Sequence, residues 1–137
     1  MTGATLDFPV ADDRKFFRNL ITVMAIMLVA GFVVQLAMGR SSFNSPIVVH
    51  VHAFAFMTWI GITLAQTWLA AGGNLATHRK LGMFSIGWAI LLIILGPLVT
   101  ISSVQSGRTP FFFQPQHFLI ANPMTVIGFA GLFAAAI

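Results

Sequence analysis

The sequence predicts an all-α integral membrane protein, a helical bundle with four transmembrane helices. Of its 137 residues, 58% are hydrophobic and only 7% are charged, whereas soluble domains carry about 25% charged residues. The apolar residues gather into runs close to the length of about 20 residues that a helix needs to cross a bilayer. Because these runs take up most of the chain, we expect no soluble domain of useful size.

Residues 1–19 are expected to form a polar N-terminal arm on the cytoplasmic side. The arm holds all three acidic residues of the chain and three of its basic residues. Asp12 or Asp13 would cap a short helix at the membrane surface that contains Phe16 and Phe17. Charges precede the first apolar run and no cleavage site follows it, so we do not expect a signal peptide.

Three apolar runs follow, and each predicts one transmembrane span of a domain that covers residues 20–137. The runs lie at residues 20–38, 47–71 and 81–103. Pro97 should kink the third span, because proline removes one backbone hydrogen bond and clashes with the preceding turn. The second and third spans are expected to be joined by a basic loop over residues 72–80.

A fourth span is predicted at residues 118–137, after a loop over residues 106–116. Asn122 followed by Pro123 is a favourable helix start, but a helix from there has about 15 residues and reaches only about 22 Å. A start near His117 gives a longer helix with Pro123 inside it. Since the shorter helix does not cross a hydrocarbon core of about 30 Å, we expect this span to be incomplete and the natural chain to continue.

The basic residues predict the orientation of the chain. Five Lys and Arg side chains lie before the first span or between the second and third, whereas Arg40 and Arg108 lie in the other two loops. Because cytoplasmic loops carry the excess of basic residues, we expect a multi-pass protein of a bacterial inner membrane with a cytoplasmic N-terminus. Arg79 and Lys80 are then expected to contact lipid headgroups.

Composition excludes several kinds of chemistry. The chain has no cysteine and no carboxylate side chain after Asp13, which excludes thiol chemistry, iron–sulfur ligation and paired-carboxylate catalysis. No charged residue lies within a predicted span, which argues against a pump or an ion transporter. No basic cluster exceeds three residues, so nucleic acid is not an expected partner. We therefore expect no catalytic residue, no metal site and no enzyme activity.

The histidines are the remaining candidates for chemistry. His50, His52 and His117 are predicted near the outer membrane face, and His78 lies alone near the inner face. His52 and His117 would lie at the same depth, where two imidazoles can hold the iron of a haem b or one can ligate the magnesium of a chlorophyll or bacteriochlorophyll. The favoured interpretation is that these amphipathic side chains only form hydrogen bonds at the membrane boundary.

Two further features concern contacts with neighbours. Phe111, Phe112 and Phe113 lie between two prolines, and we expect them at the headgroup boundary or against a partner protein. Gln66 lies deep in the second span, where a side-chain amide usually forms a hydrogen bond to another helix.

A set of polar, aromatic and small residues runs through the second span, the basic loop and the third span. It consists of His52-Ala53, Trp59, Gln66-Thr67, the segment Leu-Ala-Thr-His-Arg-Lys-Leu-Gly at residues 75–82, and Gly96. This set resembles a group of poorly characterised bacterial multi-span membrane proteins. Its His-Arg-x-Leu-Gly element is also distantly similar to transmembrane cytochromes b and ferric-reductase-like proteins. The resemblance implies a helical bundle, usually with more spans than this chain has.

Two classes of function follow. The first is a non-catalytic accessory or structural subunit that packs beside a larger respiratory or photosynthetic complex, with lipids and other integral membrane subunits as partners. The second is a haem b protein of electron transfer with His52 and His117 as axial ligands, or a chlorin-binding subunit that uses one histidine. The near absence of acid–base and redox-active side chains favours the first.

Overall fold

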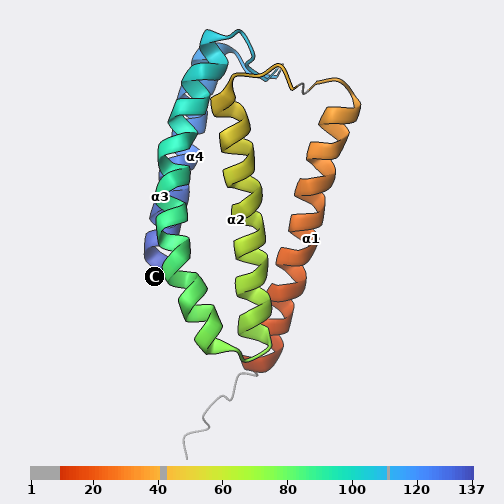
Figure 1. The fold of residues 1–137 in the computed structure, drawn as a ribbon, viewed down its shortest axis with the longest axis vertical. Coiled ribbons are helices and arrows are strands. Elements are labelled where there is room, and N and C mark those ends of the chain that lie inside the picture. The colour runs from red at the N-terminus through yellow and green to blue at the C-terminus, as the bar shows by residue number, and fades with distance from the viewer. Residues whose placement is uncertain (1–9, 41–42, 111) are drawn as a thin grey trace, which may run out of the picture.

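The computed structural model describes residues 10–40, 43–110 and 112–137, and it describes side chains from Asp13 onward within them. The regular structure of these residues is α-helical. It consists of α1 (Val10–Ala37), α2 (Ile47–Ala71), α3 (Leu75–Gln105) and α4 (Pro115–Ala136), shown in Figure 1. All four helices are long and apolar enough to cross a membrane, which confirms the predicted fold class of a multi-pass helical bundle.

Helix α1 continues without a break from the predicted N-terminal arm into the first span. The described part of the arm is helical from Val10, so the expected short surface helix with Phe16 and Phe17 is the first part of α1. The physical reason is that no proline or glycine lies between Val10 and Gly31, and nothing else in that stretch ends a helix. Residues 1–9 lie outside the described part of the chain.

Helix α3 begins earlier than the expected start of the third span near residue 81. The side-chain oxygen of Asn74 accepts a hydrogen bond of 3.2 Å from the backbone N–H of Thr77, which is the usual arrangement at a helix start. The turn before it is short because Gly73 adopts a positive φ of 76°. Residues 78–80, which were expected in a loop, therefore lie in the first turns of α3.

Helix α4 begins at Pro115 and contains Pro123 in its interior. Of the two starts considered for the fourth span, the one at Asn122 and Pro123 is wrong, whereas the earlier start near His117, with Pro123 inside the helix, agrees with the structure. Pro115 occupies the first helical position, where the missing N–H of a proline costs nothing. With 22 residues, α4 does not have the shortfall in length that the later start implied.

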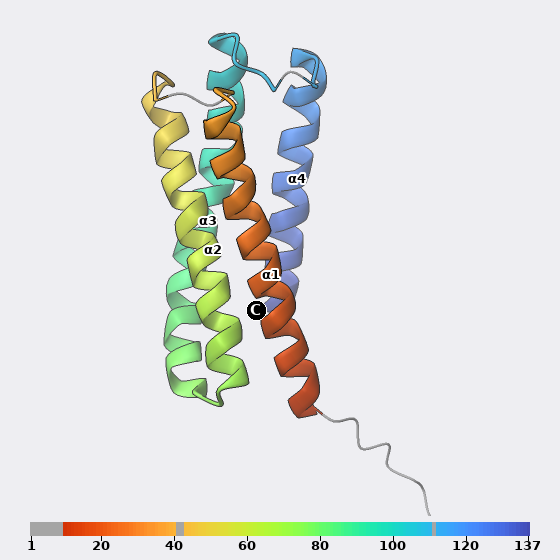
Figure 2. The same ribbon diagram turned by 90° about the vertical axis from the view of Figure 1, so that its right-hand side faces the viewer.

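Each helix packs against its neighbour in the chain, α1 on α2, α2 on α3 and α3 on α4. In Figure 1, α2 lies between α1 on the right and the α3–α4 pair on the left, and in Figure 2 both α1 and α4 lie to the right of α2 and α3. The backbones of α2 and α4 never come within 8 Å of each other, measured between Cα atoms. Helices α1 and α2 are close at the end near Ala71 and diverge toward the other end (Figure 1).

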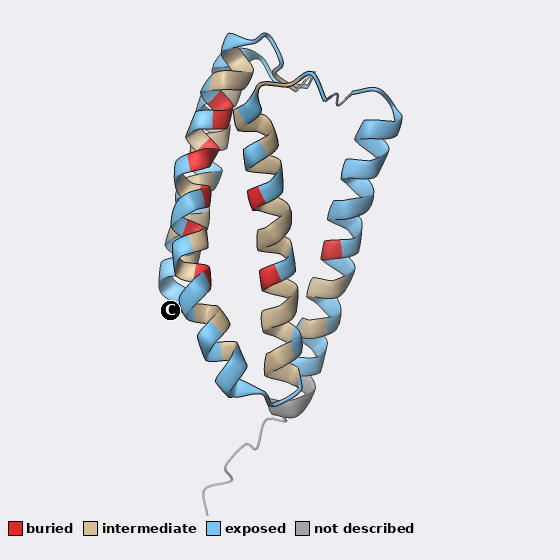
Figure 3. Cartoon of the chain, in the orientation of Figure 1, coloured by how far each residue is buried: buried red, intermediate tan, exposed pale blue. Residues whose placement is uncertain are grey.

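The small core lies along α3. Of the 18 residues in its most apolar stretch 39% are buried, against 6% in α1, 11% in α2 and none in α4, and Figure 3 shows this difference. A cross-helix hydrogen bond of 2.9 Å joins the indole N–H of Trp88 to the carbonyl oxygen of Ala55. The remaining surface is largely apolar, as expected for helices surrounded by lipid rather than water.

Candidate functional site

His50, in the first turn of α2, and His78, in the first turn of α3, both form hydrogen bonds to backbone carbonyl groups. The Nε2 atom of His50 donates to the carbonyl oxygen of Phe43 at 3.1 Å, and the two rings stack with centroids 6.4 Å apart. The Nδ1 atom of His78 donates to the carbonyl oxygen of Gln66 at 3.2 Å. These contacts tie the start of α2 to the preceding turn and the start of α3 to the end of α2, so both rings have a structural role.

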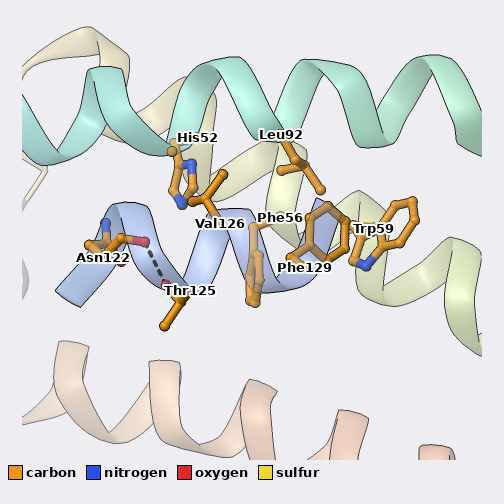
Figure 4. Close-up of a pocket in the computed structure, with 9 residues that line it drawn as sticks. His52, Phe56, Trp59, Leu92, Asn122, Thr125, Val126 and Phe129 are labelled. Atoms are coloured by element: carbon orange, nitrogen blue, oxygen red, sulfur yellow. Dashed lines mark hydrogen bonds between the residues drawn. The ribbon is translucent and has the colours of Figure 1, made fainter. Parts of the chain in front are cut away.

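His52 lines a pocket between α2, α3 and α4. The pocket has a volume of about 260 Å³, and Figure 4 shows the residues around it. Its wall is aromatic and aliphatic at one end and polar at the other; it consists of His52, Phe56, Trp59, Leu92, Gly96, Asn122, Thr125, Val126 and Phe129. The Nδ1 atom of His52 is buried and has no hydrogen-bond partner.

The pocket exists because α3 approaches α4 closely whereas α2 does not. A Cβ atom on Gly96 would lie only 2.7 Å from Cγ2 of Val126, so the absence of a side chain there lets α3 and α4 pack tightly. Aromatic side chains bridge part of the wider space between α2 and α4. The ring of Trp59 meets those of Phe129 and Phe133 edge to face, with centroids 5.3 and 5.5 Å away.

The hydroxyl groups at the polar end already have partners. Asn122 donates through Nδ2 to Oγ1 of Thr100, which in turn donates to the carbonyl oxygen of Gly96 at 2.8 Å. The hydroxyl of Thr125 donates to the carbonyl oxygen of Asn122 at 2.6 Å. The imidazole of His52 is therefore the pocket group with an unused, buried hydrogen-bonding atom.

His117 is not brought to this pocket. It lies in the first turn of α4, its side chain is exposed, and it is absent from the pocket wall. A haem held between two imidazoles needs both rings at one cavity. The pocket volume of about 260 Å³ also lies below the range of about 300–1,000 Å³ that is typical of sites for drug-sized ligands. A tetrapyrrole is larger than a drug-sized ligand. The residues present thus do not fit a haem ligated by His52 and His117. Among the described residues, no group of three or more His, Cys, Asp or Glu side chains is placed to hold a metal ion.

The other predicted contact residues lie at the two ends of the bundle. Arg79 and Lys80 are exposed at the start of α3. Phe112 and Phe113 are 64% and 37% exposed at the opposite end, and the ring of Phe113 also contacts that of Phe118, with centroids 5.9 Å apart. Phe111 lies outside the described residues.

The expected side-chain hydrogen bond of Gln66 to another helix is not formed. Its Oε1 atom is buried without a partner, and its Nε2 atom lies where a Cβ on Gly82 would be 3.3 Å away. Contact with α3 runs through the backbone carbonyl of Gln66 instead, which accepts from His78.

Sequence reasoning missed Asn122 and Phe129 as pocket residues. The signal for Asn122 was ambiguous, because an asparagine before a proline also indicates a helix cap. Phe129 is one of fourteen phenylalanines, and nothing in its local pattern sets it apart from a lipid-facing side chain.

Comparison with protein families, with curated proteins and with solved structures found no match. The resemblance carried by residues between His52 and Gly96 therefore stays a prediction.

Proposed function

We propose that this chain is a non-catalytic membrane subunit that packs beside a larger membrane complex, respiratory or photosynthetic. One observation carries the proposal, the open face of small residues on α4. Gly128, Gly131 and Ala135 share a helix face, all three are exposed, and a Cβ added at either glycine would meet nothing within 4 Å.

A face of this kind fits a second helix better than it fits lipid alone. Lipid tails are as apolar as leucine, so helices in a bilayer associate through close packing, and small residues four apart let two backbones approach. Gly131 and Ala135 have that spacing. The face points away from α3, since Val126 and Phe129 on the other side of α4 contact α3 and the pocket.

The test is the state of the protein when it is extracted from native membranes in a mild detergent. We expect wild type to migrate in native electrophoresis with another membrane protein, and the double variant Gly128→Leu, Gly131→Leu to migrate alone. Ala136→Leu is the matched control, because Ala136 is also exposed on α4 and gains similar bulk, but its side chain points about 100° away from that of Ala135. A wild-type protein that is always monomeric, or a double variant that keeps its partner, would contradict the proposal.

The haem b or chlorin alternative would use His52 as its ligand, but the pocket at His52, about 260 Å³ in volume, is too small for a tetrapyrrole. It predicts a Soret band, or a long-wavelength chlorin band, in protein purified from native membranes, and loss of that band in His52→Ala. A colourless wild-type protein removes this alternative.

We also propose that the N-terminus lies in the cytoplasm of a bacterial cell. The support is that the starts of α1 and α3, with five basic residues, lie at one end of the bundle and the turns with Arg40 and Arg108 at the other (Figure 1). The chain has no cysteine, so single cysteines at the exposed positions Ala76 and Gln105 are clean probes. A membrane-impermeant thiol reagent applied to whole cells or spheroplasts should label Gln105→Cys and spare Ala76→Cys; the reverse would overturn the orientation.

A further inference from the structure

We infer that the pocket at His52 binds the ring of a lipid-soluble quinone or quinol, with the isoprenoid tail in the surrounding lipid. This inference does not depend on a partner complex, because the pocket is built from α2, α3 and α4 of one chain. Three observations carry it: the size of the pocket, the distribution of its polar and aromatic groups, and its depth in the bundle.

The size selects a single substituted ring. A cavity of about 150 Å³ in a protein interior is enough to bind benzene, and this pocket has about 260 Å³. The additional space suits the ring substituents of a quinone, whereas a tetrapyrrole is excluded as argued above. The pocket is partly open to the outside of the bundle, so a long tail has a way out.

The wall has separate surfaces for the face of the ring and for its oxygen atoms. Phe56, Trp59 and Phe129 offer aromatic surfaces against which a flat ring packs. At the other end, His52 has a buried Nδ1 without a partner. A neutral imidazole carries one donor and one acceptor nitrogen, so it can donate to a quinone carbonyl or accept from a quinol hydroxyl.

An unpaired buried nitrogen is costly to leave in a folded protein. Because the imidazole of His52 lines the pocket, a ligand oxygen that bonds to the ring would offset part of that cost. Neither Thr100 nor Thr125 competes for the ligand oxygen, because both hydroxyl groups donate within the helices. Figure 4 shows His52 reaching from α2 toward α4, where Asn122, Thr125 and Val126 lie.

The depth suits a ligand that enters from the lipid. His52 lies in the second turn of α2, which begins at Ile47, near the end of the bundle where Arg108 donates to Ser45 at 3.1 Å. The polar end of the pocket is thus close to the membrane boundary, while Trp59 and Phe129 lie deeper. An amphipathic ring with a long apolar tail matches this gradient.

The test is titration of wild-type protein in nanodiscs with decylubiquinone, followed by quenching of tryptophan fluorescence, because Trp59 lines the pocket. After correction for the decylubiquinone that partitions into the lipid, measured with empty nanodiscs, the quenching of tryptophan fluorescence should saturate as the quinone concentration rises. We expect His52→Leu to raise the Kd about tenfold, the loss of one well-placed hydrogen bond in a buried site. His117→Leu is the matched control, an exposed histidine outside the pocket, and should leave the Kd unchanged.

Two further measurements keep the inference falsifiable if His52→Leu misfolds. Thr125→Leu adds bulk at the pocket wall and keeps the imidazole, and it should abolish saturable quenching while circular dichroism stays helical. Decylbenzene, which has the ring and tail but no oxygen, should compete with decylubiquinone only weakly. Absence of saturable quenching in wild type, equal Kd values for wild type and a folded His52→Leu, or equally strong competition by decylbenzene would each overturn the inference.

Discussion

The close approach of α3 and α4 at Gly96 predicts a large cost for a single added methyl group. In Gly96→Ala the new Cβ would lie 2.7 Å from Cγ2 of Val126, whereas carbon atoms in favourable contact are about 3.5–4.0 Å apart. Either the helices separate by about 1 Å or Val126 turns away. Rotation of Val126 is unfavourable, because a valine in a helix is held largely in one side-chain rotamer.

The magnitude follows from two opposing effects. Overpacking of a tightly packed site costs about 1–3 kcal/mol, and the better helix propensity of alanine returns up to about 1 kcal/mol. Gly87→Ala on the same helix separates the two, because a Cβ there meets nothing within 4 Å and only the propensity changes. We expect Gly96→Ala to be less stable than Gly87→Ala by about 1–3 kcal/mol.

The assay is reversible unfolding in mixed micelles, with the free energy of unfolding taken from the loss of helical signal as the denaturing detergent is increased. Val126→Ala removes the methyl group that Gly96→Ala meets, so the double variant should recover much of the loss, with a coupling energy of at least about 1 kcal/mol. If Gly96→Ala and Gly87→Ala have the same stability, or if Val126→Ala brings no recovery, the reasoning about this contact is wrong.

Three other changes test single contacts. Asn74→Ala removes the side-chain cap of α3 and should cost about 1 kcal/mol, with faster amide hydrogen exchange confined to the first turn of α3; a uniform change over α3 would refute this. Trp88→Phe deletes the indole hydrogen bond to Ala55 and should cost about 0.5–1.5 kcal/mol in the micelle assay, and a neutral result would show that the bond contributes nothing net. Arg18→Gln removes the guanidinium that lies 5.0 Å from the ring centroid of Trp68 and should cost about 0.5–1 kcal/mol, whereas an equal loss for Arg18→Lys, which keeps the positive charge, would argue against a cation–π origin of the effect.

Local pattern was enough for the class of fold and for most of the helices, because length and apolarity decide whether a segment can cross a bilayer. It was least successful where two local signals competed. Asn122 and Pro123 are typical of a helix start, yet the helix begins at Pro115. The basic residues at 78–80 look like a loop, yet the cap at Asn74 places them in a helix.

The candidate site shows the same division. His52 was recognisable as a candidate from its position in an apolar span, but its neighbours in the pocket come from three helices, and no spacing along the chain brings Trp59 to Phe129. The proposed pairing of His52 with His117 failed to form because depth in the membrane can be read from span boundaries, whereas the direction in which a side chain points depends on how each helix is rotated against its neighbours.

The amino-acid sequence by itself determined that this protein is a four-span membrane bundle, because backbone groups in lipid must find their hydrogen bonds within helices. Only the tertiary structure decided that α3 carries the core, that Gly96 admits Val126, and that a pocket at His52 remains between α2 and α4. The physical reason is that helix packing depends on the shape of side-chain surfaces that meet across the bundle, and that shape is a property of pairs of helices and not of any one segment.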